Sequence, residues 1–165
     1  MIADSHTVSA TFEPLQACSA EAPWIEGEFS AKQAVVRGKR ILLVEDQEPV
    51  RASLRMILEL DDHQVTEAGN GAEALSLFTV GEFDLVVTDF EMPVMEGNEL
   101  AVRLKLLTPS LPILMISASE RARSDVGNPV DALVNKPFTL PDLRRALGKL
   151  LSARPDPALV SAILA

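Results

Sequence analysis

Short apolar runs recur along residues 38–153 and alternate with segments in which apolar residues return every three or four positions. Uninterrupted apolar runs indicate strands buried on both faces, whereas the wider spacing indicates amphipathic helices. Their alternation predicts an α/β fold, a doubly wound, five-stranded parallel sheet with five helices. The expected strands are Ile41–Val44, His63–Ala68, Leu85–Thr88, Ile113–Ile116 and Ala132–Asn135.

Signals for helix starts fall between these strands. Asn70 followed by Glu73 resembles a capping box, and Thr139 followed by Pro141 predicts a second cap with proline in the first turn. Each helix should bury one face. The residues expected on these inward faces are Val50, Leu54, Ile57 and Leu58 in a helix over Pro49–Leu60, Ala74, Leu75 and Phe78 in the next, Leu100, Leu104 and Leu107 after Gly97, and Leu140, Leu143, Leu147, Leu150 and Leu151 in the last.

The last two helices carry further expectations. The segment Glu120–Val126 is short and polar, and Gly127-Asn128-Pro129 stops it, so the fourth helix is predicted to be short or irregular. In the fifth helix, the face opposite the leucines is predicted to meet water. That face carries Arg144, Arg145 and Lys149.

The two ends of the chain lack this periodicity. Residues 1–37 mix scattered apolar and acidic residues, including the single tryptophan, Trp24, and are predicted to form a flexible N-terminal extension. Residues 38–153 are predicted to form one domain. Residues 154–165 begin with an Arg-Pro-Asp-Pro stretch and are predicted to form a C-terminal tail.

Composition narrows the class of protein. The formal net charge of −9 argues against direct binding to nucleic acid, because phosphates repel an acidic surface. Cys18 is the only cysteine, so no disulfide can form within the chain, which suits a reducing compartment. The first residues show no pattern of a signal peptide, and no apolar run approaches the length needed to span a membrane. These features predict a cytoplasmic protein without membrane insertion.

Polar groups follow four of the predicted strands. Glu45 and Asp46 follow the first, Asp89 the third, Ser117 the fourth and Lys136 the fifth. In parallel sheets, ligands bind beyond the carboxyl ends of the strands, so these groups are predicted to form one site. Three neighbouring carboxylates repel one another unless a cation neutralises them, and oxygen ligands of this kind suit Mg²⁺.

The same set of groups suits phosphoryl transfer. Asp89 could serve as a ligand, a base or a nucleophile. A carboxylate that attacks phosphorus needs the charge of its target masked, which a cation and Lys136 would do. The Ser117 hydroxyl could donate a hydrogen bond to a transferred phosphoryl oxygen. Such transfer depends mainly on positioning and electrostatics.

The order of these motifs resembles the receiver domain of bacterial response regulators, of the kind represented by chemotaxis regulators. The likeness runs from Lys39 to Leu151. It implies that Asp89 is the phosphoacceptor and that Ser117 and Lys136 respond to the phosphoryl group. It also implies that Mg²⁺ is held by Glu45, Asp46, Asp89 and the backbone carbonyl of Glu91. The quoted motifs are Glu45-Asp46, Asp89-Phe90-Glu91-Met92-Pro93-Val94-Met95-Glu96-Gly97, Ser117-Ala118 and Lys136-Pro137-Phe138, with a cis peptide expected before Pro137.

The resemblance further implies a signalling switch that catalyses its own phosphorylation and dephosphorylation, not a metabolic enzyme. Its phosphoryl donor would be a histidine kinase or a histidine phosphotransfer protein. Only about fourteen residues follow Leu151, so output is expected through contact with a downstream protein that the sequence does not identify. Formation of a homodimer is compatible with this reading.

Two other functions stay open at this level. An aspartate-nucleophile, Mg²⁺-dependent phosphatase would use Glu91 as its second carboxylate, and a degenerate receiver would act only as a binding scaffold. One departure from the family concerns the position three residues before the lysine, which often holds an aromatic switch. Leu133 occupies it here, and the chain has no tyrosine, so output through an aromatic side-chain flip is not expected.

Overall fold

The computed structural model describes residues 35–124 and 129–152. In these residues strands and helices alternate along the whole domain, as the hydrophobic pattern predicts. The elements are β1 (Arg40–Val44), α1 (Glu48–Glu59), β2 (Gln64–Ala68), α2 (Gly71–Leu77), β3 (Leu85–Asp89), α3 (Gly97–Leu107), β4 (Ile113–Ser117), α4 (Arg121–Ser124), β5 (Ala132–Asn135) and α5 (Leu140–Ser152).

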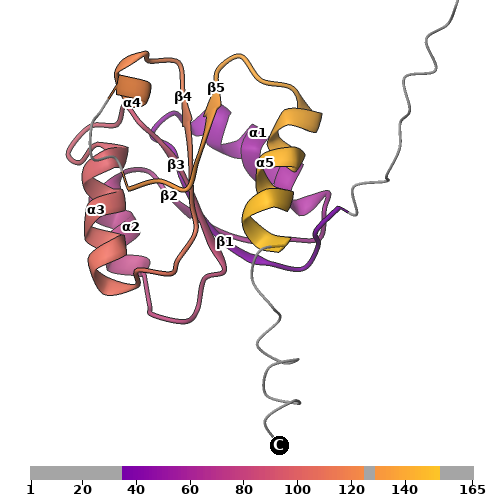
Figure 1. Cartoon of the computed structure of the whole chain (residues 1–165), viewed down its shortest axis with the longest axis horizontal. Helices are drawn as coiled ribbons and strands as arrows, with labels where there is room; N and C mark the ends of the chain where they lie inside the picture. Colours follow the sequence, from indigo (N-terminus) through magenta and orange to yellow (C-terminus); the bar gives the residue numbers. More distant parts are fainter. Residues whose placement is uncertain (1–34, 125–128, 153–165) are drawn as a thin grey trace, which may run out of the picture. The chain divides into compact units, whose positions relative to one another are not determined.

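All strand pairs are parallel, and the order across the sheet is β2-β1-β3-β4-β5. Strand β2 therefore forms one edge of the sheet, β3 lies at its centre and β5 forms the other edge. Helices α2 and α3 lie on one side of the sheet, and α1 and α5 lie on the other (Figure 1). The prediction of a doubly wound parallel sheet is confirmed. Its central strand, β3, carries Asp89 as its last residue.

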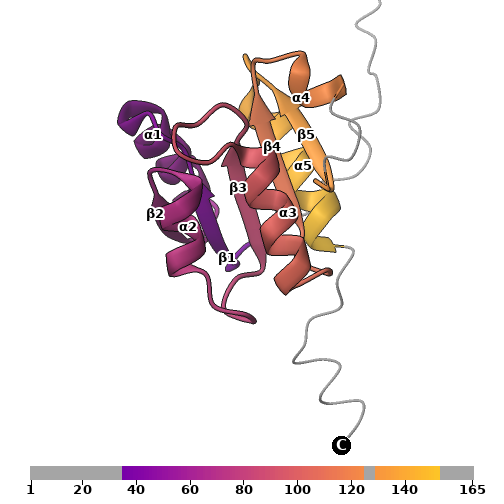
Figure 2. The ribbon, with the colours of Figure 1, turned by 90° about the vertical axis from the view of Figure 1, so that its left-hand side faces the viewer.

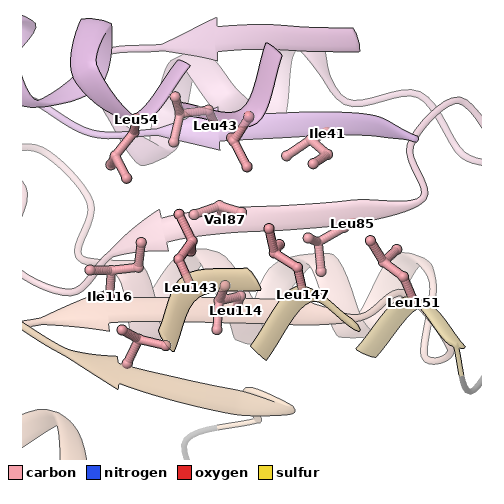
Figure 3. Packing of buried hydrophobic residues seen from close by; sticks show 12 residues of the cluster. Ile41, Leu43, Leu54, Leu85, Val87, Leu114, Ile116, Leu143, Leu147 and Leu151 are labelled. Atoms are coloured by element: carbon pink, nitrogen blue, oxygen red, sulfur yellow. The ribbon is translucent and has the colours of Figure 1, made fainter. Parts of the chain in front are cut away.

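Alternate residues of each strand enter different cores, because successive side chains point to opposite faces of a sheet. On the face covered by α1 and α5, the central strands contribute the odd positions of β1 and β3 and the even positions of β4. Three leucines of α5, one turn or two turns apart, pack onto them (Figure 3). The buried members are Ile41, Leu43, Leu54, Leu58, Leu85, Val87, Leu114, Ile116, Val134, Leu143, Leu147 and Leu151.

The opposite face of the sheet packs against α2, α3 and the loop that follows β3. Met92 and Met95 of that loop are buried here and fill the space beside the two helices. A third, smaller cluster joins Phe90, Met115 and Ala122. The main members of the second core are Leu42, Val44, Ala68, Ala74, Val86, Leu100, Ala101, Leu104, Leu111 and Ile113.

Helix α3 differs in detail from the expectations, whereas α4 agrees with them. Leu107 is 57% exposed, so the prediction that it faces inward is wrong. Ala101 takes that place, because Leu100, Ala101 and Leu104 form the stripe that faces the sheet. Helix α4 is short, as predicted, and spans Arg121–Ser124 in the described residues.

A salt bridge to a buried aspartate joins α5 to the turn after α1, between residues 83 positions apart in the chain. Asp61 is 2% exposed and accepts hydrogen bonds from Arg144 Nε at 2.8 Å and Arg144 Nη2 at 2.6 Å. Arg144 is partly exposed, as predicted, with 36% of its side chain accessible, but its pairing with a buried carboxylate was not predicted. A comparable pair links Arg40 to Asp84, where both guanidinium and backbone donate to the carboxylate.

The two predicted flanking segments lie mostly outside the described part of the chain. Of the extension 1–37 only residues 35–37 are described, and the tail 154–165 is not described, so both remain predictions. Among the described helices, none combines the length and the apolar character needed to cross a membrane.

Candidate functional site

The carboxyl ends of β1 and β3 bring three carboxylates together. The two strands are neighbours in the sheet, with Val44 opposite Thr88. Glu45 and Asp46 follow β1 directly and Asp89 ends β3, so their oxygen atoms converge within 4.8 Å of one another. Glu45 is 1% exposed and Asp89 is 7% exposed. The clustering predicted from the strand ends is present in the structure.

Lys136 reaches this cluster from the end of β5. Its Nζ donates to Asp89 Oδ2 at 2.9 Å and to Glu45 Oε2 at 3.0 Å. The backbone of the lysine is fixed by a hydrogen bond from Lys136 N to Ser117 O at 2.8 Å, which ties the end of β5 to the end of β4. The peptide bond between Lys136 and Pro137 is cis, as the resemblance implied.

The electrostatics of the cluster are unbalanced, with three carboxylates around one ammonium. Burial raises the pKa of Glu45, and the nearby charge of Asp89 adds to this effect, while the hydrogen bond from Lys136 acts against it. Burial alone would lower the pKa of Lys136, but its hydrogen bonds to Asp89 and Glu45 outweigh burial and raise that pKa. The lysine therefore stays charged, and the carboxylates remain only partly neutralised.

Asp46 supplies the clearest sign that a cation belongs here. Its Oδ1 is buried and has no hydrogen-bond partner in the described structure. A buried carboxylate oxygen without a partner is costly and calls for an ion or water that completes its bonding. The donor set of Glu45, Asp46 and Asp89 consists of oxygens only, which fits a hard divalent cation such as Mg²⁺.

Arg51 holds the backbone that carries two of these carboxylates. Its Nη1 donates to the carbonyl oxygen of Glu45 at 2.7 Å and contacts that of Asp46 at 3.5 Å. Its Nε lies 3.5 Å from Glu67 Oε2 on β2. The helical pattern of the sequence does not distinguish Arg51 from an arginine that faces water, so this role was not predicted. The only available signal was its position in the first turn after the acidic pair.

Hydrogen bonds hold both the side chain and the backbone carbonyl of Asp89. Phe90 N donates to Asp89 Oδ1 at 2.7 Å, and Thr88 Oγ1 donates to Asp89 O at 2.9 Å. Gly97, the first residue of α3, packs against this carbonyl, and a Cβ built on Gly97 would clash with it. Only glycine allows the helix to start so close to the strand end, which explains the spacing of Asp89 and Gly97 in the sequence.

The other residues singled out in the sequence are Ser117, Glu91 and Leu133. Ser117 ends β4, is 1% exposed, and its hydroxyl accepts a hydrogen bond from Ser119 N at 2.9 Å. Its strand neighbour Ile116 lies opposite Asp89 in the sheet. The Glu91 side chain is exposed on the loop after β3. Leu133 packs against the cluster of Phe90, Met115 and Ala122, so an aliphatic side chain fills the expected aromatic position.

Comparisons with known proteins agree with this geometry. The family model of the response regulator receiver domain matches residues 41–148. The receiver protein CpdR of Brucella abortus is 41% identical over 118 residues, which cover 70% of this chain and 98% of CpdR. The chemotaxis protein CheY of Halobacterium salinarum is 34% identical over 118 residues, with 70% and 98% covered.

A solved structure shares the fold at similar identity. The response regulator TrrA of Thermotoga maritima, in complex with Mg²⁺-BeF, has a TM-score of 0.65 and 35% identity, and the match covers 68% of this chain and 99% of TrrA. Other relatives are much longer, since the chain spans 13% of the sensor kinase/phosphatase LuxN of Vibrio harveyi, at 35% identity over 114 residues. Because the family model matches residues 41–148 and the match to CpdR covers 98% of that protein, the chain belongs to the response regulator receiver domain family, whose members are switches of two-component signalling.

Proposed function

We propose that this receiver domain accepts a phosphoryl group onto Asp89 from a phosphohistidine, and that Glu45, Asp46, Asp89 and the backbone carbonyl of Glu91 hold the Mg²⁺ that the transfer requires. The donor is a histidine kinase or a histidine phosphotransfer protein of the cytoplasm. The observation that carries the proposal is the under-neutralised cluster, in which a buried Asp46 oxygen lacks a partner beside the Asp89–Lys136 pair.

The transfer exchanges one bond to phosphorus for another. The P–N bond to the donor imidazole breaks, its electron pair stays on the nitrogen, which takes up a proton, and a P–O bond forms to Asp89. Mg²⁺, when bound, lowers the repulsion between the carboxylates and the phosphoryl oxygens. Phe90 N holds one Asp89 oxygen at 2.7 Å and Lys136 holds the other at 2.9 Å, which fixes the orientation of the carboxylate.

In this proposal, Lys136 and Ser117 respond to the product. Once Asp89 carries the phosphoryl group, Lys136 follows the new negative charge, and the Ser117 hydroxyl donates to a phosphoryl oxygen, in exchange for the bond that it now accepts from Ser119 N. These moves shift a two-state equilibrium of the fold. Because Leu133 is aliphatic, the shift reaches a partner protein, or a second copy of the chain, without an aromatic flip.

The test uses phosphoramidate, a small donor with the P–N bond of phosphohistidine. Wild-type protein with Mg²⁺ is expected to gain one phosphoryl group, which mass spectrometry of peptides locates on Asp89, and EDTA is expected to prevent this. Asp89→Ala should gain none, while Asp142→Ala, which removes an exposed carboxylate of α5, should behave like wild type. Labelling that persists in Asp89→Ala would overturn the proposal, and turnover of a phosphoester substrate would favour a phosphatase instead.

A further inference from the structure

A groove runs along α5, between this helix and Val35, which precedes β1. We call it the α5 groove. Its volume is about 470 Å³, and its lining includes three residues with little or no polar surface and three basic residues: Val35, Pro141 and Gly148, with Arg144, Arg145 and Lys149. Within the described part of the chain, α4, β5 and the phosphoacceptor site contribute no residue to this lining. Helix α5 lies behind the sheet when the domain is seen from the side of α2 and α3 (Figure 2).

The charge of the α5 groove is opposite to that of the whole chain. The chain carries a formal net charge of −9, yet no carboxylate is among the described residues that line the groove. Lys149 is exposed and forms no salt bridge with another described residue. Arg145 uses Nη1 to bind Asp142, and Arg144 uses Nε and Nη2 to bind Asp61. Because a guanidinium has five N–H donors, both arginines keep donors for a further anion.

Gly148 deepens the groove although it weakens the helix. It lies in the interior of α5, which spans Leu140–Ser152. Glycine destabilises a helix interior relative to alanine, because it loses more backbone freedom on folding. A Cβ built on Gly148 meets nothing within 4 Å, so the packing of the domain does not require glycine at this position. The missing side chain leaves open space along the helix, where another backbone can come close.

The dimensions of the groove suit a short extended segment. From Pro141 to Lys149 the helix rises by about 12 Å, at about 1.5 Å per residue. An extended chain covers this length with about four residues. Arg145 and Lys149 are four positions apart, so they lie on the same side of α5. Val35, which is 38% exposed, adds an apolar surface. A matching segment carries carboxylates on both sides of an apolar side chain.

We propose that the α5 groove is a docking site for an acidic, extended segment of a partner protein. The backbone of this segment lies over Gly148, and its carboxylates lie beside Arg145 and Lys149. Its apolar side chain covers Val35 and leaves water, which favours docking. Asp89 takes no part in this contact, so docking is measured separately from phosphoryl transfer.

The experiment uses the full chain, without Mg²⁺ and without a phosphoryl donor. The probe is an acetylated peptide of sequence Glu-Glu-Leu-Gly-Glu-Glu, and the same peptide with glutamine in place of glutamate lacks its charges. Amide signals in ¹H–¹⁵N NMR spectra report where each peptide binds and how tightly. In the wild type, the acidic peptide should cause saturable shifts at Val35, Gly148 and Lys149, and the glutamine peptide should not.

Two variants test the groove itself. Gly148→Ala should raise the melting temperature by about 3 °C, yet weaken binding of the acidic peptide about fivefold, because the added methyl group takes the space of the peptide backbone. Lys149→Glu should weaken binding about tenfold through repulsion. Ser53→Ala, which favours the helical state of α1, is the control for stability, and Arg103→Glu on α3 is the control for charge. Both controls should bind the peptide as the wild type does.

Three results would overturn the proposal: no saturable shifts in the wild type, equal affinity for the glutamine peptide, or unchanged binding in Gly148→Ala. Shifts of the same signals with protein concentration, in the absence of peptide, would assign the groove to a second copy of the chain and overturn the proposal as well.

Discussion

Two places in the described part of the domain where buried carboxylates meet a cation differ in charge balance. Asp61 meets one guanidinium, that of Arg144, through two short hydrogen bonds of 2.8 and 2.6 Å. At the carboxyl ends of the strands, three carboxylates meet one ammonium, that of Lys136, and Asp46 Oδ1 has no partner. The balanced pair joins α5 to the turn after α1. The unbalanced cluster is organised to receive a further cation.

Removal of the single ammonium should give the largest effect on stability. In Lys136→Met, the buried carboxylates of Glu45 and Asp89 lose their partner, so the free energy of unfolding in EDTA should fall by about 3 kcal/mol. Mg²⁺ should restore much of this loss, because it supplies the missing positive charge. Urea denaturation with and without Mg²⁺ measures both values, and a loss of the same size under both conditions would contradict a cation site.

The balanced pair should respond differently to the equivalent change. Arg144→Ala leaves Asp61 buried without a counter-charge and should lower the free energy of unfolding, by less than Lys136→Met because the arginine side chain is 36% exposed. Mg²⁺ should not alter this loss. The adjacent Arg145→Ala, which breaks an exposed pair with Asp142, is the control and should change stability little. Recovery of Arg144→Ala by Mg²⁺ would remove the distinction between the two groups.

Substitution of Arg51 tests the hydrogen bonds that hold the backbone of the acidic cluster, without changing the charges of the carboxylates. Arg51→Ala frees the carbonyl oxygens of Glu45 and Asp46 and should weaken Mg²⁺ binding about tenfold, as loss of a supporting hydrogen bond at a metal site commonly does. Arg55→Ala is the matched control, since Arg55 pairs with Glu59 and Glu67 on the surface. Isothermal titration calorimetry gives both dissociation constants. Equal affinities in the two variants would mean that Arg51 does not support the site.

The smallest effect concerns His63, a buried group beside Asp61. Burial lowers the pKa of His63 below its ordinary value of 6.5, although the charges of Asp61 and Asp62 oppose this, and Lys39 adds to it. The ring nitrogen Nδ1 accepts a hydrogen bond from Lys39 N at 3.2 Å, which requires the neutral form. The unfolded chain binds the proton more readily, so stability should be constant above the ordinary pKa and fall as the pH drops from 6.5 towards the lower folded value.

His63→Asn tests this pH dependence, because asparagine keeps an acceptor but does not titrate. The difference in unfolding free energy between wild type and variant should shift against the wild type as the pH falls below 6.5. His6 is present in both proteins and cancels in the difference. A difference that does not change with pH would show that His63 titrates alike in the folded and unfolded chain.

The sequence was sufficient for the order of the elements and for the centre of the site. Four apolar runs and the segment His63–Ala68 predicted the five strands to within about one residue. Parallel strands place their carboxyl ends at one edge of the sheet, whatever the conformation of the loops. The sequence alone therefore placed four residues in one cluster: Glu45, Asp46, Asp89 and Lys136. The N-cap of α2 could also be predicted, because a capping motif involves only neighbouring residues. The Asn70 side chain accepts a hydrogen bond from Glu73 N, as the motif predicts.

Long-range and backbone features escaped prediction for a physical reason. The partner of Arg144 lies 83 residues away, and an arginine that pairs with a buried carboxylate has the same helical spacing as one in water. Leu107 was predicted to face inward, but it is the last residue of α3 and is 57% exposed. The backbone of Val94 has a φ of 71°, which runs against the preference of a β-branched residue.

The most direct test of the account is the thermal stability of wild type and Asp46→Asn in EDTA and in Mg²⁺. The substitution removes one negative charge from an under-neutralised cluster, so in EDTA the variant should melt above the wild type. Mg²⁺ at one hundred times its Kd should stabilise the wild type by about 2.7 kcal/mol and the variant far less. A wild-type melting temperature that Mg²⁺ does not move, or an equal gain in both proteins, would contradict the claim that these carboxylates form a cation site.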